Sequence, residues 1–154
     1  MTPQIPRIYR VFFTTLDPLL AATGVLTALF YPSALLKPYS PIAALPPALE
    51  TSSLLIMLAG FYAATLLLQV VVLRMRPDDL GLWRVLQLSI LFQDVFILAA
   101  FARSMGIQGR LSPLAWHADE AGTIATTAGV GFVRARFLLD RKWDCQKDEI
   151  LIGG

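Results

Sequence analysis

Cysteine and histidine are nearly absent from this chain of 154 residues, and each scarcity excludes a kind of site. The single cysteine, Cys145, rules out an internal disulfide and a cysteine-rich metal site. The single histidine, His117, has no partner with metal-ligand spacing on one helix, so we expect no metal and no cofactor. The sequence also has no nucleophile elbow and no phosphate-binding loop, which leaves triad and nucleotide chemistry unsupported.

Charged residues are scarce as well. They make up 16% of the chain, whereas 56% of residues are hydrophobic and the mean hydropathy is +0.62. A soluble domain of this size needs a larger polar surface, so the composition predicts an integral membrane protein. The net charge is only +2, and the basic residues flank apolar runs without interleaved aromatics. We therefore do not expect nucleic acid as a partner.

Four apolar runs fill most of the sequence, at about 11–31, 51–73, 82–102 and 119–139. About 20 helical residues cross a hydrocarbon core of roughly 30 Å, so each run is long enough to span a bilayer. The last run is rich in glycine and threonine and needs close helical neighbours. We expect an all-α fold, a four-helix transmembrane bundle, with residues 1–154 forming one integral membrane domain.

Proline marks the connection between the first two runs. We expect this connection to be an extended, ordered loop that caps a cavity mouth, because it contains Pro32, Pro38, Pro41, Pro46 and Pro47. Within the first run, Asp17-Pro18 can be read as a helix start. A helix from Pro18 to Tyr31 is too short to span, however, so we expect it to begin earlier, with Pro18 freeing the Thr14 carbonyl.

The distribution of lysine and arginine predicts the orientation. The first run has no small-residue cleavage site, so we expect it to stay as a span. The positive-inside rule then places both termini in the cytoplasm, and the endoplasmic reticulum is the expected membrane. One side would hold Arg7, Arg10, Arg74, Arg76, Arg84, Arg134, Arg136, Arg141, Lys142 and Lys147, and the other Lys37, Arg103 and Arg110.

Two carboxylates within the apolar runs are the candidate catalytic residues. An acid at the middle of a span is costly to insert, so Asp94 is expected to have a partner or a task. It shares a helix face with Gln87 and adjoins Gln93, so this stripe should face the bundle interior. Asp94 could act as a general acid or base, or could form a structural hydrogen bond to Gln69 or to a threonine of the fourth run. Asp17 could likewise have a role in the site, or could serve only as the N-cap of a helix that begins at Pro18.

A second polar group lies at the opposite ends of the runs. Glu50 opens the second run, and His117, Asp119 and Glu120 open the fourth. Acids at a helix N-terminus are stabilised by the helix dipole, and that alone explains Asp119. Glu120 shares its helix face with Thr123, Thr127 and Arg134. We therefore keep Glu50, His117 and Glu120 as candidate substrate-binding residues, together with Gln69, Gln87 and Gln93.

The segment from Ile5 to Pro18, IPRIYRVFFTTLDP, with the later Val72-Leu73-Arg74, Trp83-Arg84 and Gln93-Asp94, resembles a family of small four-span fungal membrane proteins. The resemblance covers the whole chain. It implies a role in polyketide or terpenoid secondary metabolism, similar to the membrane epoxide hydrolases and cyclases of aurovertin-type and citreoviridin-type polyene pathways. More distantly, the chain is similar to the emopamil-binding and sigma-2 receptor superfamily, although the histidine and glutamate set of sterol isomerases is absent.

These observations predict a cofactor-independent membrane enzyme that opens, cyclises or isomerises a lipophilic small molecule, most simply an epoxide. Such a reaction needs an acid for the epoxide oxygen and a base for the attacking group, and Asp94 and Asp17 could divide these roles. Helix geometry places the two carboxylates about 9 Å apart in depth, which would leave room for water and an epoxide. The alternatives are a sterol-binding or lipid-binding protein without this chemistry and a purely structural bundle. The sequence leaves the substrate, the stereochemistry and the oligomeric state open.

Overall fold

The computed structural model describes residues 5–40 and 45–140, and every regular element within these ranges is a helix. The first long helical segment consists of α1 (Arg7–Val11), the π-helical turn η1 (Phe12–Leu16) and α2 (Asp17–Phe30). The second consists of α4 (Leu49–Leu67), the π-helical turn η2 (Leu68–Val72) and α5 (Leu73–Met75). The other long helices are α6 (Leu80–Ile107) and α7 (Ala118–Leu139).

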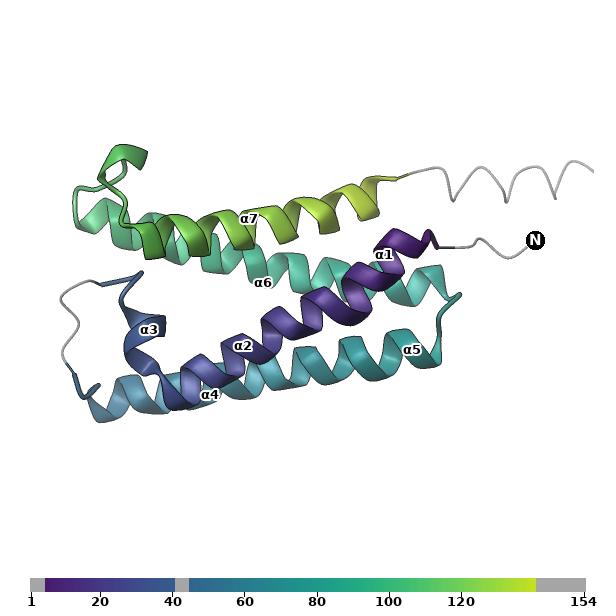
Figure 1. Cartoon of the computed structure of the whole chain (residues 1–154), viewed down its shortest axis with the longest axis horizontal. Coiled ribbons are helices and arrows are strands. Elements are labelled where there is room, and N and C mark those ends of the chain that lie inside the picture. Colours follow the sequence, from purple (N-terminus) through teal and green to yellow (C-terminus); the bar gives the residue numbers. More distant parts are fainter. Residues whose placement is uncertain (1–4, 41–44, 141–154) are drawn as a thin grey trace, which may run out of the picture.

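The long helices pack as an all-α bundle, as predicted. Figure 1 shows α2 running beside α4 and α7 beside α6, and these pairs make the most extensive contacts between elements. Of the described helices, three are long and apolar enough to cross a membrane: Arg7–Phe30, Leu49–Met75 and Leu80–Ile107. The helix α7 is not among them, because its charged residues, threonines and glycines lower its hydropathy, so its role as the fourth span stays a prediction.

Two helical boundaries differ from the predicted runs. The third helix is longer than the predicted span of about 82–102, because α6 continues to Ile107, and Gly109 follows with a positive φ. The loop after the first span is not fully extended, because residues Pro32–Leu36 form the short helix α3. Proline is well suited to the first helical position, where its missing N–H has no intrahelical role. The predictions that involve Pro41, Arg141, Lys142, Cys145 and Lys147 concern residues outside the described ranges.

An aromatic cluster fills the end of the bundle where α1 and α5 lie. Its buried members are Ile5, Phe13, Leu73, Trp83 and Phe137. The rings of Phe13 and Phe137 meet edge to face with centroids 5.4 Å apart, and Trp83 Nε1 donates to the Arg76 carbonyl at 3.0 Å. Each such ring contributes about 1.5–3 kcal/mol through burial. This packing fixes the ends of α1, α6 and α7 against one another.

At the other end, the segment after α2 is attached to α6. Tyr39 stacks on Phe101 with ring centroids 4.1 Å apart. The Tyr39 carbonyl accepts hydrogen bonds from Ser104 Oγ and from Gln108 Nε2, the latter at 2.8 Å. These contacts hold α3 across the end of the bundle. Figure 1 shows α3 beside α2 at this end.

The π-helical turn η1 has a direct local cause, and η1 and η2 together have a consequence for the polar side chains of the bundle. Pro18 cannot donate to Thr14, and the Thr14 carbonyl instead accepts a hydrogen bond from Arg74 Nη2 at 3.3 Å. The helix therefore starts before Pro18 and passes through it, as predicted. The turns η1 and η2 contact each other across the bundle. Asp17 directly follows η1 and Gln69 lies in η2, so the two turns set the directions of these side chains.

Candidate functional site

Arg134 of α7 lies at the centre of a buried polar cluster. Its Nη2 donates to Asp17 Oδ1 and Oδ2 at 2.6 and 2.7 Å, and its Nη1 donates to Asp94 Oδ2. Its Nε donates to Gln87 Oε1 at 3.3 Å. Arg134 is 3% exposed, Asp17 4% and Asp94 8%. One guanidinium therefore joins carboxylates from α2 and α6.

Gln69 completes the cluster from α4's continuation in η2. Its side chain is fully buried, and Nε2 donates to Asp17 Oδ2. Its Oε1 has no hydrogen-bond partner within the part of the chain that the structure describes. A buried carbonyl oxygen normally accepts a hydrogen bond, so the unpaired Oε1 is an unfavourable feature of the position that Gln69 takes beside Asp17.

The charges of the cluster do not balance if every group is ionised. Asp17 and Asp94 would contribute two negative charges and Arg134 one positive charge. An uncompensated buried charge is costly, so the simultaneous ionisation of all three groups would be unfavourable. Two carboxyl groups about one guanidinium could therefore divide the roles of general acid and general base.

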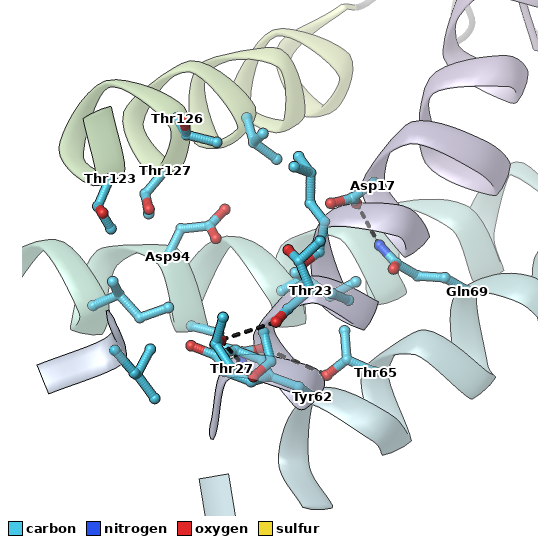
Figure 2. A pocket seen from close by; sticks show the side chains of 18 of the residues that line it. Asp17, Thr23, Thr27, Tyr62, Thr65, Gln69, Asp94, Thr123, Thr126 and Thr127 are labelled. Carbon is cyan, nitrogen blue, oxygen red and sulfur yellow. Dashed lines mark hydrogen bonds between the residues drawn. The ribbon is translucent and has the colours of Figure 1, made fainter. Parts of the chain in front are cut away.

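The cluster forms the wall of a cavity of about 300 Å³ between α2, α4, α6 and α7. Figure 2 shows Asp17, Gln69 and Asp94 beside threonines of α2 and α7. A Cβ atom added to Gly131 would lie 3.5 Å from Asp94 Oδ2. The absence of a side chain at Gly131 therefore leaves room for the Asp94 carboxylate. The polar lining residues are Asp17, Thr23, Thr27, Tyr62, Thr65, Gln69, Gln93, Asp94, Thr123, Thr126, Thr127 and Arg134.

The structure brings most of the predicted inner residues together. Asp17, Asp94, Gln69 and Gln93 all line the cavity, and Gln93 Oε1 accepts a hydrogen bond from Thr65 Oγ1 at 3.5 Å. Gln87 is fully buried but lies outside the lining, where it holds Arg134. The prediction that Asp94 and Gln87 face the bundle interior is confirmed. The catalytic role of the carboxylates stays a prediction.

The predicted outer residues do not reach this cavity. Glu50 lies exposed in the first turn of α4, and His117 is exposed before α7. Glu120 is buried, but it accepts hydrogen bonds from Arg110 at 2.7 and 3.0 Å and from the His117 backbone N–H at 2.8 Å. These contacts give Glu120 a structural role in closing the N-terminus of α7.

Arg134 is the residue whose role sequence reasoning missed. Counting it among the charges that flank the spans was wrong, because it is buried between helices. Its predicted helix face, shared with Glu120, Thr123 and Thr127, was the signal that could have placed it inside. The helix geometry predicted from the sequence leaves room for water and an epoxide between the two carboxylates. In the structure the Arg134 guanidinium lies between them.

The model of a family described as Domain of unknown function (DUF7704) matches residues 2–142. No curated protein and no solved structure matches the chain. The matched range includes the whole described bundle, so the polar cluster and its cavity lie within the family's region.

Proposed function

We propose that this chain, which belongs to the family described as Domain of unknown function (DUF7704), is a membrane-embedded enzyme that opens an epoxide in a lipophilic substrate. One observation carries the proposal. Two buried carboxylates contact one guanidinium at the wall of a cavity of about 300 Å³. The apolar composition of the helices supports a membrane location, from which a lipophilic substrate could enter.

The two carboxyl groups differ in their hydrogen bonds. Asp17 accepts three hydrogen bonds, two from Arg134 and one from Gln69. Asp94 accepts one side-chain hydrogen bond, from Arg134, within the described residues. Because Asp94 has fewer donors around it, we assign to Asp94 the proton and the role of general acid, and to Asp17 the role of general base.

The reaction follows from these roles. A water molecule in the cavity donates one hydrogen bond to Asp17 Oδ1, which still has a free lone pair. As the water oxygen attacks an epoxide carbon, its proton passes to Asp17, the carbon–oxygen bond breaks, and the epoxide oxygen takes the proton of Asp94. The product is a diol, and proton transfer from Asp17 back to Asp94 restores the starting state. A substrate hydroxyl in place of water would give a cyclic ether.

The test uses the full chain purified in detergent, with the epoxide of oleyl alcohol as the probe substrate. Diol formation and incorporation of heavy oxygen from labelled water are measured by mass spectrometry. Asp94→Asn and Asp17→Asn should each lower kcat by at least about a hundredfold, because each removes a proton-transfer group. Glu120→Gln is the matched control, since it neutralises a buried carboxylate outside the cavity.

Full activity of Asp94→Asn would refute the acid–base mechanism. Binding of the probe without turnover by the unaltered protein would favour the alternative of a sterol-binding or lipid-binding protein. Comparing the metabolites of cells with and without the gene would then identify the natural ligand in either case.

A further inference from the structure

A second hollow continues from the inner cavity to the end of the bundle. It has a volume of about 720 Å³ and lies between α2, α3 and α7. The two hollows share lining residues, namely Leu20, Thr23, Ala34, Thr123, Thr126 and Thr127. The two hollows therefore adjoin along these side chains, and the pair, termed the passage, reaches from α3 to the carboxylate cluster.

The threonines of this passage present hydrogen-bond acceptors to a ligand. Thr23 Oγ1 donates to the Leu20 carbonyl at 2.7 Å. Thr123 and Thr126 donate to carbonyls of α7 at 2.9 and 2.8 Å. A hydroxyl has one proton and two lone pairs, so a threonine whose proton is used by its own helix still accepts from outside. The shared part of the passage thus favours ligand groups that donate hydrogen bonds.

The charges at the mouth also bear on the ligand. Lys37 and Asp119 both line the outer hollow, so the mouth has no excess charge of one sign. A carboxylate or phosphate group would face the acceptor oxygens of the threonines without a matching set of donors. A neutral hydroxyl group can donate to these oxygens and carries no such penalty.

The helical rise of α7 gives the length of the passage. Thr126 precedes Arg134 by eight residues, which corresponds to about 12 Å along the helix. Asp119 precedes Arg134 by fifteen residues, or about 22 Å. A ligand that reaches from the mouth to the cluster must therefore be elongated, with its hydroxyl group well separated from the group at Asp94.

We infer that the ligand of this passage is an elongated, neutral lipophile that bears a hydroxyl group about 12–16 Å from its reacting epoxide, with the hydroxyl donating to Thr126 or, farther out, to Thr123. This inference rests on the proposed function for the identity of the reacting group and adds the substrate class. The hydroxyl-binding part is a property of the passage alone and can be tested separately.

The kinetic test compares the epoxide of oleyl alcohol with its methyl ether, which has the same chain but cannot donate a hydrogen bond. The unaltered protein should prefer the alcohol by about tenfold in kcat/KM, as expected for one or two hydrogen bonds. In the Thr123→Val/Thr126→Val variant the preference should disappear, with the loss confined to the alcohol. Thr15→Val, on the exposed side of η1, is the matched control and should keep the preference.

A binding test separates this inference from the proposed function. Thr126→Cys is introduced into a Cys145→Ser background, and maleimide labelling of the new thiol is followed with oleyl alcohol or its methyl ether, neither of which contains an epoxide. Protection by the alcohol alone supports the inference even if no epoxide is turned over. Equal protection by both compounds, or none by either, overturns it even if epoxide turnover is found.

Discussion

Replacement of Arg134 by methionine tests the central feature of the structure. The guanidinium donates four hydrogen bonds, to Asp17, Asp94 and Gln87, and is 3% exposed. Its removal leaves two buried carboxylates without a cation. Breaking a buried ion pair by removing one partner costs about 3–5 kcal/mol. For a chain of this size we expect the midpoint of thermal unfolding to fall by about 10 °C.

The charge count makes a sharper prediction for the neutralised variants. Asp94→Asn replaces a carboxyl group that the proposed mechanism keeps protonated with a neutral amide of similar shape, so it should change stability by less than about 1 kcal/mol. Asp17→Asn weakens two ionic hydrogen bonds to Arg134 and should cost about 1.5–3 kcal/mol. The triple variant Asp17→Asn/Asp94→Asn/Arg134→Met holds no charge in the cluster and should recover most of the stability lost in Arg134→Met.

Thermal unfolding in one detergent, followed by circular dichroism, measures all of these variants. The reasoning is refuted if Arg134→Met unfolds at the same temperature as the unaltered protein, because an arginine at the membrane surface would behave in that way. It is also refuted if the triple variant is less stable than Arg134→Met, since neutral side chains would then be worse than unpaired carboxylates.

Three further predictions concern other parts of the molecule. Gly24→Ala should cost about 1–3 kcal/mol and lower turnover, because the added Cβ would lie 2.9 Å from Tyr62 Cδ2 and displace this ring of the cavity wall; unfolding and activity assays check it. Glu120→Gln should lower the unfolding midpoint through its weakened contact with Arg110 but leave kcat unchanged, and an equal fall in kcat would contradict the structural role. Tags on both termini should be accessible from the cytosol in selectively permeabilised cells, whereas opposite accessibility would exclude an even number of spans.

The helices could be predicted from the sequence because membrane spans have a strong compositional signal. The interior position of Asp94 and Gln87 followed from their shared helix face, and the course of the first helix followed from the short distance between Pro18 and Tyr31. Predictions of this kind depend only on the residues of a single helix. The start of α3 at Pro32 was missed because proline both ends helices and begins them.

The central arginine could not be placed in the same way. A basic residue near the end of an apolar run follows the positive-inside pattern whether it flanks the membrane or extends back into the bundle. The difference depends on which carboxylates the neighbouring helices present, and Asp17 lies 117 positions away in the chain. The π-helical turns were also outside sequence reasoning, because hydrophobic periodicity over short segments does not distinguish them from α-helix.

The turn η1 joins two parts of one helix that face different partners. Tyr9 before it and Phe13 within it contact the aromatic cluster, and after it Asp17 faces Arg134. A π-helical turn contains one residue more than the α-helical turn that it replaces, so η1 accommodates an extra residue without the rotation of about 100° that one residue adds in a regular α-helix. A single codon gained or lost at this turn therefore changes the number of residues between the aromatic cluster and Asp17 while Asp17 keeps its direction toward Arg134.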